Sequence, residues 1–120
     1  MQLISKKLVS RLHGSKAIGH YCLGCDDLHF ILLTYKGKHC NFDFNLENPT
    51  FEGAFQQVWG ETPEERRLCR YKIVQGSIRY FSACSHEYAG SSLNLSDVPQ
   101  SIIEDYEISP FGEAIKWKTR

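Results

Sequence analysis

The sequence has no excess charge of either sign, because 14 Lys and Arg residues balance 14 Asp and Glu residues over 120 positions. Binding to nucleic acid without sequence preference depends on positive charge that neutralises phosphates, so this balance disfavours that class. No apolar run approaches the ~20 residues that a membrane-spanning helix needs. Residues 1–10 lack the apolar core and cleavage site of a signal peptide. We therefore expect a cytoplasmic protein with no membrane association.

The chain also lacks a Pro-rich, Gly/Ser-rich or charged linker of the kind that separates two domains. Its length fits one domain, and its 42% of hydrophobic residues can form a modest core. We expect a single domain with a β core over residues 17–98. A strand or helix over 1–16 would precede this core, and a C-terminal extension over 99–120 would follow it.

Strand signals dominate the chain and helix signals are weak. Runs of β-favouring residues predict strands at 29–35, 39–44, 70–74 and 77–81, and the short, mixed segment 17–22 is a further strand candidate. The dipeptide Gln75-Gly76 favours a tight hairpin turn, because glycine tolerates positive φ. Short helices are expected near 62–65 and within 97–103. The fold class is therefore β-rich, an α+β chain with minor helix and antiparallel hairpins.

Cysteine is more frequent than usual, with five residues in the chain. An odd number without a signal peptide argues against a disulfide framework and favours metal ligands. Cys22 and Cys25 form a C-x2-C knuckle, in which Gly24 lets the backbone curl so that both thiolates face one ion. The same motif serves thiol–disulfide exchange, but there it normally opens a helix, whereas here a strand follows. We therefore expect a zinc-knuckle or zinc-ribbon-like site.

The other two expected ligands of Zn²⁺ lie in the second half of the chain. A hairpin over 70–81 would return the chain and bring Cys69 beside the segment 84–86. The expected ligand set of a tetrahedral site is Cys22, Cys25, Cys69 and His86. Cys84 and His29 are alternates for completing this set. Cys40 lies in an aromatic stripe and is expected in the core, and His13, His20 and His39 are expected at the surface.

The order of several of these motifs along the chain resembles the sequence pattern of a known family. The knuckle with His29, residues 45–51 ending in Pro-Thr-Phe, Cys69 before a hairpin, and residues 84–90 all take part. The chain resembles a set of small uncharacterised phage and prophage proteins, some of which carry the doubtful name ammonia monooxygenase. The resemblance covers roughly residues 20–98. It departs from the family pattern at Leu23, Arg70 and Tyr88, where the family has proline, often histidine, and leucine.

The resemblance implies a small metal-binding phage protein and no particular reaction. We expect an interaction module in which four protein ligands close the zinc shell. Its partner would be a host protein in the host cytoplasm, such as a defence or regulatory protein that it inhibits. The loop 45–55 and the segment around Trp59 are candidate contact surfaces, since aromatic residues often carry binding energy.

Two other functions remain open. One is a metal-dependent hydrolase or deaminase with an open zinc site, which would need Cys22, Cys25 and His86 as ligands and Glu87 or Asp27 as base. The known zinc deaminase and His-Glu-x-x-His patterns are absent, so an enzyme is not favoured.

The second is a zinc-ribbon protein that binds nucleic acid. Basic residues gather around the predicted hairpin, together with two aromatic residues that could stack on bases. These residues are Arg66, Arg67, Arg70, Lys72 and Arg79, with Tyr71 and Tyr80. Nearby acidic residues offset the charge, so a solvated mixed-charge face is the preferred interpretation.

Overall fold

Strands are the main secondary structure of the described residues, and they pair in antiparallel fashion within two main sheets. The computed structural model describes residues 1–10, 17–35, 37–106 and 108. The first sheet has the order β1-β2-β3-β4, with strands Gln2–Leu3, Leu8–Ser10, Ala17–Cys22 and Asp27–Leu32. The second has the order β10-β9-β8-β7, with strands Ser92–Asn94, Ser77–Tyr80, Arg67–Val74 and Phe51–Trp59. The pair β5 (Thr34–Tyr35) and β6 (Lys38–His39) and the helix α1 (Gln100–Asp105) complete the described elements.

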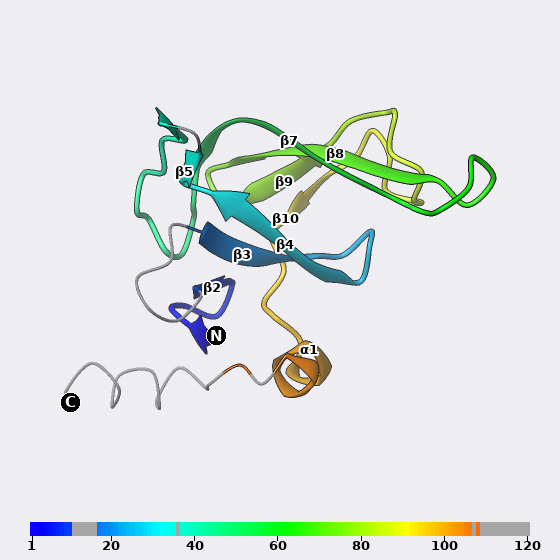
Figure 1. Cartoon of the computed structure of the whole chain (residues 1–120). Helices are drawn as coiled ribbons and strands as arrows, with labels where there is room; N and C mark the ends of the chain where they lie inside the picture. The colour runs from blue at the N-terminus through cyan, green and yellow to red at the C-terminus, as the bar shows by residue number, and fades with distance from the viewer. Residues whose placement is uncertain (11–16, 36, 107, 109–120) are drawn as a thin grey trace.

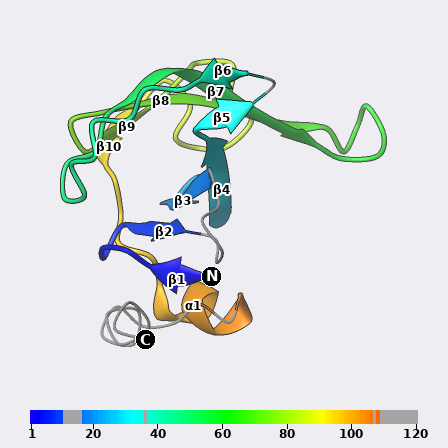
Figure 2. The same ribbon diagram turned by 60° about the vertical axis from the view of Figure 1, so that its left-hand side comes forward.

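The two sheets and the helix form three layers. The second sheet lies over β3 and β4, and α1 lies on the other side of the first sheet (Figures 1 and 2). Both faces of β3 are therefore covered, and all six of its residues are buried. Because alternate residues of a strand point to opposite faces, β3 contributes to two separate cores.

The core between the sheets is built from alternate residues of both. Cys69, Tyr71 and Ile73 line the inner face of β8, and Ile18 and Ile31 meet them from the first sheet. The second core, between the first sheet and α1, includes Val9, Tyr21, Leu28 and Ile102. The candidate site described below lies at one end of the core between the sheets, where β3, β4 and β8 approach one another.

The β7–β8 hairpin extends away from the rest of the molecule and ends in the loop 60–66 (Figures 1 and 2). We call residues 57–67 the arm. Gln57 pairs with Cys69, and Trp59 pairs with Arg67. Directly opposed residues of an antiparallel pair share a face, so Gln57 and Trp59 lie on the face that carries Cys69. The Trp59 side chain is nevertheless 42% exposed.

The predicted β-rich fold of antiparallel strands with minor helix is confirmed. The strand predicted at 17–22 is β3, and the predicted hairpin is formed by β8 and β9. Gln75 and Gly76 at its turn have φ values of 49° and 76°, in the left-handed region that such a turn requires. The predicted division into segments stays a prediction, and positions 11–16 and 109–120 lie outside the described residues.

The prediction of a strand at 39–44 is wrong beyond its first residue, because β6 ends at His39. The Asp43 carboxylate accepts hydrogen bonds from the backbone N–H groups of Asn45 and Thr50, and Phe44 has a φ of 58°. Such bonds from a short side chain to nearby backbone favour turns over strands. Similarly, the strand predicted at 29–35 is divided between β4 and β5.

Two further predictions are wrong, one in the arm and one in the segment before it. Thr62–Glu65 forms a turn and not a helix, in which the Glu65 N–H donates to the Thr62 carbonyl. The segment 45–55, expected to be a loop, contains the first five residues of β7. Most of β7 is exposed, so it lacks the apolar alternation from which a strand is recognised.

Candidate metal centre

Four of the predicted or alternate ligands lie together between the two sheets. Their donor atoms all lie within 4.8 Å of one another, and they belong to Cys22, Cys25, His29 and Cys69. Cys69 also belongs to a second group within the same distance, together with Cys84 and His86. These groups could hold a metal ion. Three of the four ligands that the sequence predicted therefore share one cluster, and its fourth donor comes from the alternate His29.

The β3–β4 hairpin positions three of the four donors. Cys22 is the last residue of β3, His29 lies in β4, and Cys25 lies in the turn between them. Asp26 has a φ of 51°, which reverses the chain, and its carboxylate accepts a hydrogen bond of 2.6 Å from the Tyr21 hydroxyl. The fold of this hairpin therefore directs both thiols of the knuckle and the His29 ring towards the second sheet.

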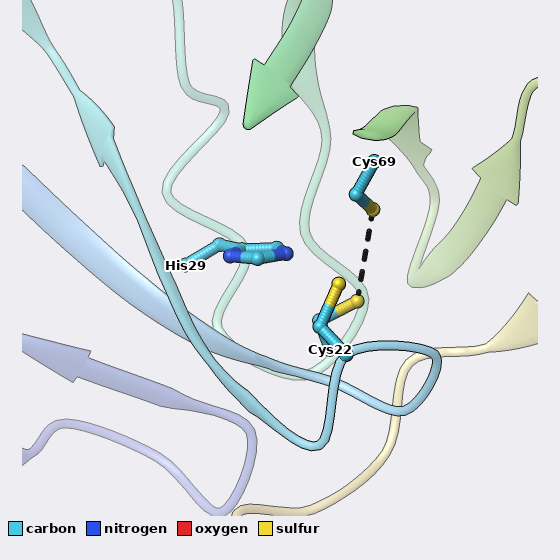
Figure 3. Close-up of side chains that lie close together, drawn as sticks. Cys22, His29 and Cys69 are labelled. Atoms are coloured by element: carbon cyan, nitrogen blue, oxygen red, sulfur yellow. Dashed lines mark hydrogen bonds between the residues drawn. The ribbon is translucent and has the colours of Figure 1, made fainter. Parts of the chain in front are cut away.

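Cys69 supplies the fourth donor from the opposite sheet. It is fully buried on the inner face of β8, and its sulfur is 3.9 Å from the sulfur of Cys22 (Figure 3). Two sulfurs bound to a tetrahedral zinc ion at about 2.3 Å are about 3.8 Å apart. The separation of Cys22 and Cys69 therefore fits two ligands of one ion. An ion bound here would join the two sheets.

The His29 ring is buried and points towards the two sulfurs (Figure 3). Its side chain is only 7% exposed, and its Nε2 atom has no hydrogen-bond partner among the described residues. An unpartnered buried polar atom costs about 1–3 kcal/mol, and a nitrogen lone pair in this position suits a metal ion. The ring stacks on Tyr71 with centroids 5.6 Å apart and an interplanar angle of 14°, which holds its orientation.

Tyr71 is itself held by a buried histidine. The Nδ1 atom of His20 lies 3.4 Å from the Tyr21 carbonyl, to which it can only donate. Nε2 is then the acceptor of the 2.8 Å hydrogen bond from the Tyr71 hydroxyl. Burial, with a smaller contribution from the neighbouring His29, lowers the pKa of His20 to about 4, which favours the neutral ring. The prediction of His20 at the surface is wrong, because its alternation with Ile18 and Cys22 puts it on the inner face of β3.

The three clustered thiols share a limited capacity for negative charge. Interactions with the neighbouring thiols of Cys25 and, to a lesser degree, Cys69 lower the pKa of Cys22. The pKa of Cys25 rises to about 12, and that of Cys69 is also raised, chiefly because of the same interactions with Cys22. Among these groups alone, a single thiolate is favoured. A divalent cation would stabilise all three as thiolates.

The Tyr80 hydroxyl supports the charge on Cys22. It lies 3.2 Å from the Cys22 sulfur and accepts a hydrogen bond of 3.4 Å from the backbone N–H of Gly24. Its own proton is thus free to be donated to the thiolate. Burial is the main cause that raises the pKa of Tyr80, which keeps the hydroxyl protonated for this role. Donors of this kind orient and tune thiolate ligands in metal sites.

His86 lies against the knuckle but interacts with Cys69. A Cβ atom on Gly24 would be only 2.4 Å from the His86 ring, so the absence of a side chain at Gly24 makes room for that ring. The Tyr88 N–H donates to Nδ1 of His86, and Nε2 lies 3.5 Å from the Cys69 sulfur. A neutral ring that accepts at Nδ1 carries its proton on Nε2. The geometry therefore favours His86 as a hydrogen-bond donor to Cys69, and its role as a ligand stays a prediction.

Cys84 and Cys40 have other partners. The Cys84 sulfur accepts from the Arg70 N–H at 3.2 Å and donates to the Arg70 carbonyl at 3.1 Å. It therefore links the segment after β9 to β8. Cys40 is partly exposed outside both groups, packs against the inter-sheet core, and donates to the Glu52 carbonyl at 3.4 Å.

Two hollows flank the knuckle, and Cys25 lines both of them. One has a volume of about 260 Å³ and is lined by Cys25, Asp27, Leu28, His29, Gln57, Val58 and Trp59. The other has a volume of about 350 Å³ and is lined by Gly24, Cys25, Trp59, Arg67, Ser85 and His86. Cys25 and His29 are therefore the members of the cluster that line these hollows.

Comparisons with protein families, with curated proteins and with solved structures each returned no match to this chain. No helix in the described residues is long and apolar enough to cross a membrane.

Proposed function

We propose that this chain binds one zinc ion through Cys22, Cys25, His29 and Cys69, and that it acts through its surface as a metal-stabilised interaction module. Two observations carry the proposal: the buried Nε2 of His29 has no hydrogen-bond partner among the described residues, and a nitrogen of the His29 ring lies within 4.8 Å of three sulfurs. A metal ion would give this nitrogen the partner that it lacks. It would also allow the three thiols to ionise together.

The donor set favours zinc. Three thiolates and one imidazole form one of the common ligand sets of structural zinc. Soft sulfur donors disfavour magnesium, calcium and manganese, which prefer oxygen. Two of the sulfurs, on Cys22 and Cys69, are fully buried, as expected for a site that contributes to folding.

A closed shell supports an interaction module over an enzyme. Four protein donors leave no coordination position for a reacting water molecule, whereas catalytic zinc usually keeps one. The two candidate bases also have other environments. Glu87 is exposed, and the Asp27 carboxylate accepts a hydrogen bond from the Tyr106 hydroxyl.

The arm offers a surface for a protein partner. Val58 is 51% exposed and Trp59 is 42% exposed, on opposite faces of β7. Exposed tryptophan is among the residue types that contribute most to protein interfaces. The expected phage origin and host target stay predictions.

The basic residues of the hairpin give less support to nucleic-acid binding. Tyr71 and Tyr80, the aromatic residues expected to stack on bases, are both buried in the inter-sheet core. The Arg70 guanidinium lies over the Phe81 ring and donates to Gln56. These groups are therefore already occupied within the chain.

The proposal is tested by measuring metal content and X-ray absorption at the zinc edge on the purified protein. We expect one zinc per chain with three sulfur ligands at about 2.3 Å and one nitrogen ligand at about 2.0 Å. A shell that contains water would point to the open-site enzyme, and an absence of zinc would overturn the proposal. For the interaction, a Trp59→Ser variant should keep its zinc but lose partners that the wild-type chain captures.

A further inference from the structure

We propose that Cys25 is a site of oxidation by hydroperoxides and that its oxidation releases the metal. This inference rests on the proposed function, because it takes Cys25 as one of the zinc ligands. It adds a chemical input, a small peroxide, to which the metal site responds.

Access distinguishes Cys25 from the other clustered thiols. Cys22 and Cys69 are fully buried, whereas Cys25 is partly exposed. Cys25 also lines both hollows beside the knuckle, and Trp59 lines both of them as well. A molecule the size of hydrogen peroxide can therefore approach Cys25 from either hollow, whereas Cys22 and Cys69 are fully buried.

The cluster also holds the second thiol that a reversible oxidation requires. The sulfurs of Cys22 and Cys69 both lie within 4.8 Å of the Cys25 sulfur. Oxidation-sensitive cysteines are typically accessible thiolates with a resolving cysteine nearby. A metal ligand meets the requirement for a thiolate, because cysteine binds metal in its deprotonated form.

The reaction is balanced with hydrogen peroxide as the oxidant. The Cys25 thiolate attacks one peroxide oxygen; an S–O bond forms, the O–O bond breaks, and the released hydroxide takes a proton to become water. A second thiolate, of Cys22 or Cys69, then attacks the sulfur of this sulfenic acid. An S–S bond forms, the S–O bond breaks, and a second proton converts the leaving hydroxide to water. Two thiolates are oxidised to a disulfide, which removes two of the four metal ligands.

The chain contains a matched control for exposure alone. Cys40 is also partly exposed, but it lies outside both donor groups. Its thiol donates to the Glu52 carbonyl, and burial raises its pKa. Cys40 should therefore remain a protonated thiol, which reacts slowly with peroxide.

The test uses the full zinc-loaded chain at pH 7.4 with less than one equivalent of hydrogen peroxide. Zinc release is followed with a chromogenic chelator, sulfenic acid is trapped with dimedone, and modified peptides are identified by mass spectrometry. We expect Cys25 to react at least about tenfold faster than Cys40, because an ordinary thiol of pKa ~8.5 is less than a tenth ionised at this pH. One zinc should leave for each disulfide between Cys25 and Cys22 or Cys69, and Cys40→Ser should not alter the rate.

Two results would overturn the inference. The first is oxidation of Cys40 as fast as that of Cys25, and the second is oxidation of Cys25 while zinc stays bound. Zinc content measured before the oxidant is added separates the two proposals. A protein without zinc contradicts the proposed function and this inference with it, whereas zinc-loaded protein with an unreactive Cys25 contradicts this inference alone.

Discussion

Replacing His29 with phenylalanine should change stability in opposite directions with and without zinc. The substitution removes the Nε2 atom, for which the described residues offer no hydrogen-bond partner, and it keeps an aromatic ring to stack on Tyr71. Without metal, the wild-type chain bears the desolvation penalty of that nitrogen, about 1–3 kcal/mol. His29→Phe should therefore be at least as stable as the wild type in the presence of a strong chelator.

With zinc the order should reverse. At a free zinc concentration about 1,000 times the Kd, binding stabilises the folded state by about 4 kcal/mol. At about 4 °C per kcal/mol for a domain of this size, zinc should raise the Tm of the wild type by roughly 16 °C. The variant has lost one of four donors, so its Tm should rise far less.

Thermal unfolding followed by circular dichroism, with chelator and with buffered zinc, measures all four values. Cys40→Ser is the matched control, because Cys40 lies outside both donor groups and this variant should keep the full zinc-dependent shift. If His29→Phe keeps the full shift as well, the assignment of His29 as a ligand is refuted. A chelator-treated variant several kcal/mol less stable than the wild type would contradict the argument about the unpartnered nitrogen.

Three further predictions address neighbouring residues. Cys22→Ser should lose bound zinc and much of the zinc-dependent stability, whereas Cys40→Ser should retain one zinc per chain, as measured by elemental analysis; a metal-free Cys22→Ser with wild-type Tm would contradict this. His86→Ala should keep one zinc but bind it about 10–100-fold more weakly, as measured by chelator competition, because the variant loses a group that hydrogen-bonds to a ligand. Complete loss of zinc would instead indicate that His86 is a ligand. Tyr71→Phe should lower stability by about 1–3 kcal/mol in urea unfolding, because the buried Nε2 of His20 loses its donor; an unchanged midpoint would show that this bond contributes nothing.

Local signals in the sequence were sufficient to predict several secondary-structure elements. The strand signals at 70–74 and 77–81 predicted the main part of β8 and β9, and Gln75-Gly76 predicted the turn between them, because short-range conformational preferences determine these elements. β7 could not be predicted in this way. Only Phe51 is buried among its nine residues, and β7 is held by pairing with β8, which lies distant in sequence.

In the candidate site, too, local features could be predicted from the sequence, whereas features that depend on packing could not. The spacing of Cys22 and Cys25 identified the knuckle, since two ligands on one turn form a local pattern. The choice between His29 and His86 depends on how the two sheets pack, and on the Tyr88 N–H that sets the tautomer of His86. His20 is likewise buried because the second sheet covers β3. The residues near His20 in the sequence do not predict this packing.

The contact between Cys22 and Cys69 spans 47 positions of the chain. A bound ion would therefore act as a reversible cross-link that closes a long loop. A covalent cross-link over a loop of this length stabilises the folded state by about 4 kcal/mol, because it lowers the chain entropy of the unfolded state. Both sheets must form and dock before the four donors meet, so the ion would bind late in folding and would mainly slow unfolding. In a reducing environment, where disulfides do not persist, a bound ion would restrain the chain as a disulfide does. Removing the ion would remove that restraint.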